Sequence, residues 1–265
     1  MLVFGFIKIF SVNATAQTFQ NGIEQYKNQN FKKAFEIWEP LATKGNVEAQ
    51  FFLGMMYHHG LGIAKDTKKA IQWYLLAAQK GNKEALFISY LIPAKQGVAQ
   101  AQINLGNMYA IGQGVDQNFK EAIKWLTLAA KQGITQAQFN LGYIYLNGQG
   151  VINYKKAAEW YLLAAKQGHV DAQFNLGNIY LNGHGINQDY NEAIKWYTLA
   201  AEQGFAKAQY NLGVMYTKGQ GVDQNFKEAF KWYKLAADQG FAKAQQNLQI
   251  LHEHEQGVDQ GYKQK

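Results

Sequence analysis

The side chains that could carry out catalysis are few in this sequence and poorly placed for it. Serine occurs only at Ser11 and Ser89, so a serine nucleophile is nearly excluded, and the absence of cysteine excludes thiol catalysis. His252 and His254 alternate with glutamates, but residues two apart on a helix point in different directions and do not easily share a metal ion. The Gly-x-Gly motifs, as at Gly112, follow predicted helices rather than strands, which makes them helix terminators. We therefore expect no catalytic residue, no metal site and no cofactor.

A motif of alanine, glutamine, a large apolar or aromatic residue, asparagine, leucine and glycine recurs along the chain. Its copies begin at Ala101, Ala137, Ala172 and Ala208, which are 36, 35 and 36 residues apart, and a divergent copy begins at Ala49. The tryptophans occupy one common position in successive units: Trp38, Trp73, Trp125, Trp160, Trp196 and Trp232. The sequence is therefore a tandem array.

Each unit is predicted to form two helices. In the first, Ala137, Leu141 and Tyr145 lie on one face at helical spacing. Gly148 and Gly150 are expected to end this helix, because glycine tolerates the left-handed conformation of a C-cap. The second helix begins at pairs with capping-box spacing, namely Asn118 with Glu121, Asp189 with Glu192, and Asn225 with Glu228. Stacked pairs of this kind form a solenoid.

These units resemble a known repeat. The pattern A-x-x-x-L-G-x-x-Y-x-x-G-x-G-V, followed by A-x-x-W-Y-x-x-A-A-x-x-G, is similar to the Sel-1-like repeat, a relative of the tetratricopeptide repeat, from Ala49 to Gly240. The resemblance implies an all-α fold, a right-handed α-solenoid of antiparallel helix pairs. It also implies that the first helices line a concave face that binds a protein or an extended peptide.

The pattern divides the chain into four parts. Residues 1–16 form a leader, 17–45 a degenerate helical pair, 46–243 the array, and 244–265 a capping helix and tail, with the helix reaching about Glu255. The array contains a truncated unit at 83–100, where the start of a first helix is fused to the end of a second. We expect one helix from about Lys83 to Gln96, kinked or frayed at Pro93, and a bend or weak joint there. Neutral drift is favoured over a functional meaning.

An asparagine immediately before each Leu-Gly pair is a candidate for partner binding. In tetratricopeptide domains this position often bonds the backbone of a bound peptide, and the resemblance gives that role to Asn104, Asn140, Asn175 and Asn211. Asparagine can both donate and accept hydrogen bonds. The alternative, left equally open, is that each asparagine bonds the backbone of a neighbouring repeat.

The same face carries aromatic and basic candidates. Exposed aromatic residues anchor interfaces, but aromatic residues at helical spacing belong more often to the core, and here the core is somewhat favoured. The aromatic candidates are Phe139, Phe174, Tyr210 and Tyr143. The basic candidates, toward the C-terminal end, are Lys207 and Lys218, with Lys243 beyond them. A peptide that ends in a carboxylate would suit this distribution.

The charge of the chain does not indicate specific nucleic-acid binding. The formal net charge is +7, but all 26 basic residues are lysines. Arginine, which supplies the bidentate contacts to bases and phosphates, is absent. A dispersed lysine coat gives only salt-sensitive attraction. We expect a protein or peptide partner, no specific nucleic acid, and a monomer.

Residues 1–16 have the features of a secretory signal peptide. Leu2 to Val12 is mostly apolar and too short to span a membrane, and residues 14–16 form an Ala-x-Ala cleavage site. Lys8 inside the apolar run, with no basic residue before it, departs from the pattern, and a start codon assigned too late would explain both. We expect an exported periplasmic or secreted protein cleaved after Ala16, or a cytoplasmic one if this segment is not functional. No later stretch is expected to span a membrane.

Two classes of function follow. The leading one is a non-catalytic adaptor or scaffold in the bacterial envelope or directed at host cells. The alternative comes from the resemblance, because some exported Sel-1-like proteins bind or hydrolyse β-lactams. Those proteins carry paired cysteines in each unit, and this chain has none.

Overall fold

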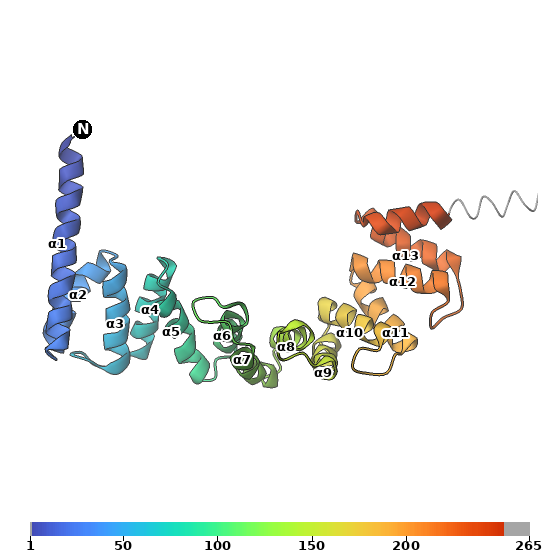
Figure 1. The fold of residues 1–265 in the computed structure, drawn as a ribbon, viewed down its shortest axis with the longest axis horizontal. Helices are drawn as coiled ribbons and strands as arrows, with labels where there is room; N and C mark the ends of the chain where they lie inside the picture. Colours follow the sequence, from blue (N-terminus) through green and yellow to red (C-terminus); the bar gives the residue numbers. More distant parts are fainter. Residues whose placement is uncertain (1, 252–265) are drawn as a thin grey trace, which may run out of the picture. The chain divides into compact units, whose positions relative to one another are not determined.

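The computed structural model describes residues 2–251, with side chains from Ala14 onward, and every element in that range is an α-helix (Figure 1). Two compact units are distinguished, the first ending at Trp125 and the second beginning at Leu126, and each is described by itself. The helices of the first unit are α1 (Leu2–Lys27), α2 (Phe31–Thr43), α3 (Val47–His59), α4 (Thr67–Gln79), α5 (Lys83–Lys95) and α6 (Ala99–Ile111). Helix α7 (Phe119–Lys131) contains the boundary. The second unit continues with α8 (Thr135–Asn147), α9 (Tyr154–Lys166), α10 (Val170–Asn182), α11 (Tyr190–Glu202), α12 (Ala206–Lys218), α13 (Phe226–Asp238) and a final helix at residues 242–251.

Consecutive helices pack against each other within each unit. In the first unit this series runs from α1 to α6, and in the second from α8 to α13. The core consists of the repeated alanines and leucines together with one large aromatic residue from most second helices. The predicted all-α solenoid of helix pairs is confirmed.

The glycine of each Leu-Gly motif allows the two helices of a pair to approach closely. A Cβ atom at Gly142 or Gly177 would lie 2.5 Å or 2.6 Å from the ring of Tyr161 or Tyr197, respectively. Both tyrosines are fully buried. A side chain larger than hydrogen would fit there only if the tyrosine ring or its helix shifted.

Buried glutamines join each pair to the preceding one in the second unit. The Nε2 atom of Gln173 donates to the carbonyl oxygen of Ala165 at 3.1 Å, and its Oε1 atom accepts a hydrogen bond from Gln203 at 2.7 Å. The same arrangement recurs at Gln138 with Ala130 and Gln167, and at Gln209 with Ala201 and Gln239. We call these bonds the glutamine ladder. They satisfy both polar ends of a side chain that is almost completely buried, which would otherwise destabilise the core.

The predicted caps are largely confirmed, with one correction. The side chains of Asn118, Asp189 and Asn225 accept the backbone N–H groups of residues in the first turn of α7, α11 and α13. Gly148 follows α8 but has φ −74°, so it is not the left-handed cap that we predicted. This loop is one residue shorter than its equivalents, and only its second glycine, Gly150, keeps the left-handed conformation that both glycines have in the loops at Gly112 and Gly183.

The truncated unit contains a single helix, α5, as expected from the fused sequence. The helix continues without a break through Pro93 to Lys95, so the predicted fraying at the proline does not occur. The capping helix is described from residue 242 to residue 251, and the remainder of the predicted helix lies outside the described residues. Helix α1 runs through the predicted cleavage position after Ala16.

Candidate functional site

The four predicted asparagines are half-buried, and two of them, Asn175 and Asn211, lie near tyrosine hydroxyls of the preceding helix. Burial raises the pKa of Tyr197 above its usual value, and a hydrogen bond from the side chain of Asn211 acts in the opposite direction. The Tyr197 hydroxyl also donates to Oδ1 of Asn178 at 2.6 Å. Burial likewise raises the pKa of Tyr161, and the nearby side chain of Asn175 lowers it. The buried Tyr161 hydroxyl has no partner with standard hydrogen-bond geometry.

The other two asparagines have neighbours on their own helices. Asn140, on α8, accepts a hydrogen bond from Gln136 at 2.8 Å. In α7 the position equivalent to Tyr161 is occupied by Leu126, so this helix has no tyrosine hydroxyl at that position. Asn104, on α6 of the first unit, accepts from Gln100 at 3.1 Å. These partners are side chains. Peptide binding by the four asparagines and the alternative, bonding to the backbone of a neighbouring repeat, both remain predictions.

The three aromatic candidates one position earlier pack between successive pairs. Phe139 stacks on His169 with ring centroids 4.4 Å apart. Phe174 contacts Phe205 at 5.1 Å and Tyr210 contacts Phe241 at 5.2 Å, in both cases with tilted rather than stacked rings. Their half-buried rings therefore contribute to the core. Tyr143 differs, because 56% of its surface is exposed.

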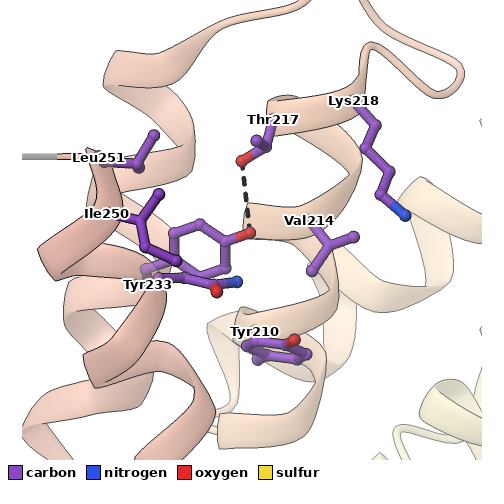
Figure 2. A pocket seen from close by; sticks show the side chains of 8 residues that line it. Tyr210, Val214, Thr217, Lys218, Tyr233, Ile250 and Leu251 are labelled. Atoms are coloured by element: carbon purple, nitrogen blue, oxygen red, sulfur yellow. Dashed lines mark hydrogen bonds between the residues drawn. The ribbon is translucent and has the colours of Figure 1, made fainter. Parts of the chain in front are cut away.

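A groove near the C-terminal end of the second unit contains two of the predicted residues (Figure 2). It lies between α12, α13 and the final helix and has a volume of about 240 Å³. We call it the C-terminal groove, and its lining residues are Tyr210, Val214, Thr217, Lys218, Tyr233, Asn247, Ile250 and Leu251. Lys207, also predicted, is exposed on α12 and is not part of the lining.

The polar groups inside the C-terminal groove are largely bonded to each other. The Thr217 hydroxyl donates to the carbonyl oxygen of Gly213 at 2.7 Å and approaches the Tyr233 hydroxyl at 3.3 Å, the contact drawn in Figure 2. Burial raises the pKa of Tyr233, whereas its hydrogen bonds to Thr217 and Asn247 lower it. Lys218 is exposed at the rim, so the groove combines a mainly apolar interior with one accessible cation.

The residues that could suggest catalysis are not arranged for it. Ser89 is 2% exposed, and its hydroxyl donates to the Leu86 carbonyl oxygen at 2.7 Å. His58 lies beside His59. Burial is the main cause that lowers the pKa of His58, and the neighbouring positive groups lower it further. Among the described residues, no three His, Cys, Asp or Glu side chains gather as metal ligands. His252 and His254 lie outside the described residues.

Within residues 2–251, no helix is both long enough and apolar enough to cross a bilayer.

The stacked pairs, their glycine contacts and the glutamine ladder define this protein as a helical-repeat solenoid. The chain belongs to the Sel1 repeat family. The family model, described as "Sel1 repeat", matches residues 13–46, 47–82, 99–134, 135–169, 170–205 and 206–241. The stretch left between the second and third matches contains α5, the helix of the truncated unit.

Two solved structures extend the similarity over most of the chain. A Sel1 repeat protein from Oxalobacter formigenes is 35% identical, with a TM-score of 0.51, and the match covers 87% of this chain and 86% of that one. A protective antigen of uropathogenic Escherichia coli, described as displaying an SLR fold, is 30% identical with a TM-score of 0.60, over 92% of this chain and 58% of the antigen.

Curated relatives match over shorter stretches. An exopolysaccharide production negative regulator of Rhizobium meliloti is 30% identical over 145 residues, which cover 42% of this chain and 54% of the regulator. The HRD3A component of an ERAD-associated E3 ubiquitin-protein ligase of Arabidopsis thaliana is 38% identical over 81 residues, covering 30% of this chain and 10% of that protein. The matches thus span about half of the first relative and a tenth of the second.

Sequence reasoning identified Tyr210 and Lys218 but missed most of the groove around them. Val214 and Thr217 lie one and two helical turns after Tyr210, so the helical period could have placed them on the same face. Tyr233 and Ile250 come from other helices, and their proximity depends on how α13 and the final helix pack.

Proposed function

We propose that this protein is a non-catalytic scaffold that binds a protein partner through the end of an extended peptide. The C-terminal groove holds the last residue of that peptide. The observation that carries the proposal is the combination of an apolar interior with an exposed lysine at the rim. The names of the curated relatives, a regulator and a component of a larger complex, support a role in protein interaction.

The size and chemistry of the C-terminal groove favour one apolar residue with a free carboxylate. Its volume of about 240 Å³ is below the range of about 300–1,000 Å³ that is typical of pockets for whole drug-sized ligands. Val214, Ile250 and Leu251 would contact an aliphatic or aromatic side chain. The Lys218 ammonium would bind the terminal carboxylate, because a charge-assisted hydrogen bond is stronger than a neutral one.

We further propose, from the sequence pattern of residues 1–16, that the protein is exported and acts in the bacterial envelope or on a host cell. The contacts of α1 are compatible with cleavage after Ala16. The Trp38 indole donates to the Phe19 carbonyl oxygen at 3.2 Å, and the rings of Phe19 and Tyr26 pack on the core cluster around Trp38. A cleaved chain would retain all of these contacts.

The proposed function can be tested with a library of peptides that differ only in their last four residues, each made with a free carboxylate and as an amide. Binding to the full chain is measured by fluorescence anisotropy. We expect selection of an apolar last residue, with amidation weakening the best peptides about tenfold, which corresponds to about 1.4 kcal/mol. The variant Lys218→Gln should weaken the acid peptides and leave the amides unchanged.

Lys207→Gln is the matched control, because Lys207 is an exposed lysine on the same helix but does not line the groove. It should bind acids and amides as the wild type does. Equal binding of the acid and amide forms by the wild type would contradict the proposal. So would an equal loss of affinity in the two lysine variants.

A further inference from the structure

Four exposed leucines form a row on the second helices of the second unit. They occupy equivalent positions in α7, α9, α11 and α13, and each has about two fifths of its surface exposed. We call them the leucine row: Leu128, Leu163, Leu199 and Leu235. An apolar side chain exposed at the same place in four consecutive units forms a continuous pattern, not a scattered surface residue.

The glutamine ladder holds the leucine row at regular intervals. Gln203 follows Leu199 by one helical turn, and its Nε2 atom donates to the carbonyl oxygen of Gly168, just after α9, at 3.2 Å. The same group reaches Gln173 of the ladder at 2.7 Å and the Leu199 carbonyl oxygen at 3.5 Å. The ends of α9 and α11 are therefore tied together close to their leucines, so Leu163 and Leu199 lie in a fixed relation.

A row of charges accompanies the leucines, and its sign reverses halfway along the second unit. The residue three positions after each leucine lies on the same side of its helix. These residues are exposed and are, in order, Lys131, Lys166, Glu202 and Asp238. The first two are basic and the last two are acidic.

The two acidic residues of this charge row lie at helix ends that favour basic residues. Glu202 and Asp238 are the last residues of α11 and α13, and the C-terminal end of a helix carries a partial negative charge that favours cations. Lys131 and Lys166 follow that preference at the ends of α7 and α9. No ion pair is recorded for Glu202 or Asp238 among the described residues. Residues that break a local rule without local compensation are expected where a surface meets a partner.

We propose that the leucine row is an interface with a second copy of this chain, related by a two-fold axis parallel to the second helices between α9 and α11. Such an axis reverses the order of the units and keeps the helix direction. Leu163 then faces Leu199 of the partner subunit, and Leu128 faces Leu235 of the partner subunit. Lys166 meets Glu202 of the partner subunit, and Lys131 meets Asp238 of the partner subunit. The whole charge row is complementary to itself.

A second pair of positions is compatible with this arrangement. Glu159 and Lys195 lie four residues before Leu163 and Leu199, on the same face. The same axis places Glu159 opposite Lys195 of the partner subunit, again with opposite charges. Lys195 already has an ion pair with Glu192 at 2.8 Å, so this contact supports the register without being required for it. The proposal replaces the monomer that we expected from the sequence.

Charge reversal provides a test with an internal control for folding. Lys166→Glu would place two glutamates together at each of two symmetric contacts, and Glu202→Lys would place two lysines there. We expect the full-length wild type to dimerise in sedimentation equilibrium and each single variant to dimerise at least about tenfold more weakly, because like charges in contact oppose association. An equimolar mixture of the two variants should form a heterodimer, because both contacts then pair glutamate with lysine. The double variant Lys166→Glu/Glu202→Lys should recover the wild-type homodimer.

The leucines provide the second arm of the experiment. Leu163→Glu should abolish dimerisation, whereas Leu76→Glu, at the equivalent exposed position of α4 in the first unit, should leave it unchanged. Circular dichroism checks that each variant remains helical. A wild type that stays monomeric at the highest soluble concentration overturns the proposal. Single variants that dimerise like the wild type, or that fail to associate when mixed, also overturn it.

Discussion

The first unit and the second unit are built from the same repeat, but only the second repeats it without interruption. Helix α5 of the first unit combines two roles in thirteen residues. Its first half behaves as a first helix, because Asn82 caps the backbone N–H of Ala85, and Ala85 packs in the core beside α4. Its second half behaves as a second helix, because the Ala94 carbonyl oxygen accepts from Gln102 of α6. The fusion keeps the surface that each neighbour needs.

The glutamine ladder is incomplete in α5 and in the helices around it. Gln50 of the first unit donates to the Ala42 carbonyl oxygen at 3.0 Å, as the ladder glutamines of the second unit do. Its Oε1 atom is buried without a hydrogen-bond partner. Lys80 stands where the second unit has Gln167, Gln203 or Gln239, and it bonds the Gly45 carbonyl oxygen instead. In α5 the ladder position is occupied by Leu86. Each pair therefore docks through two glutamines of its own, and the loss of either one breaks the ladder locally.

The largest expected effect concerns the close contact between the glycine of a first helix and the tyrosine ring of its second helix, which α5 lacks. Gly177→Ala places a Cβ atom 2.6 Å from the Tyr197 ring and should lower the free energy of unfolding by about 3 kcal/mol, because an overfilled core cannot relax without moving α11. Helix α5 contains no glycine and therefore has no equivalent contact. Urea denaturation followed by circular dichroism measures the loss. In a double-mutant cycle with Tyr197→Leu the two changes should couple, and simple additivity would show that the contact is not responsible.

The next effect compares the complete and incomplete parts of the ladder. Gln173→Leu removes two hydrogen bonds and leaves the Ala165 carbonyl oxygen and the Gln203 amide without this partner, so we expect a loss of about 2 kcal/mol. Gln50→Leu removes one hydrogen bond together with an oxygen that is already unsatisfied, so its cost should be about 1 kcal/mol smaller. Equal costs in chemical denaturation would indicate that the second bond contributes nothing.

The smallest effect is a repair of the first unit. Lys80→Gln should supply the missing donor to Gln50 Oε1 while keeping a donor for the Gly45 carbonyl oxygen, as Gln203 does for Gln173 and Gly168. We expect a gain of about 0.5–1 kcal/mol in the free energy of unfolding. Lys80→Met, which removes the donor altogether, is the matched control and should not stabilise. If both variants behave alike, the repair has not formed the bond.

The features that could be predicted from the sequence are those that depend on local spacing. The two helices of each unit, the caps at Asp189 and Asn225 and the single helix at α5 all follow from periodicity, capping residues and the register of the repeat. The prediction for Gly148 was wrong because the loop after α8 is one residue shorter than its equivalents, and its first glycine does not adopt the left-handed conformation. Local spacing cannot specify this change in the backbone of the loop.

The candidate site was predicted less well, because a side chain's neighbours belong to other helices. The sequence placed Asn211 and Phe174 on one face but could not show that Tyr197 and Phe205 would be near them. The buried glutamine recurred in nearly every copy of the motif, and that recurrence was the available signal for the ladder. Its partners, the Ala165 carbonyl oxygen and the Gln203 amide, become neighbours only when two pairs stack.

The sequence by itself therefore determined that the chain forms stacked helix pairs, since the period of its apolar residues and the position of its glycines allow no other regular structure. Only the tertiary structure decided which polar groups are buried in pairs, which lysine borders a groove, and which leucines remain exposed. The physical reason is that helix formation depends on residues within one or two turns of each other. Burial and hydrogen bonding of a side chain depend instead on helices about 35 residues apart along the chain, whose relation is fixed by packing.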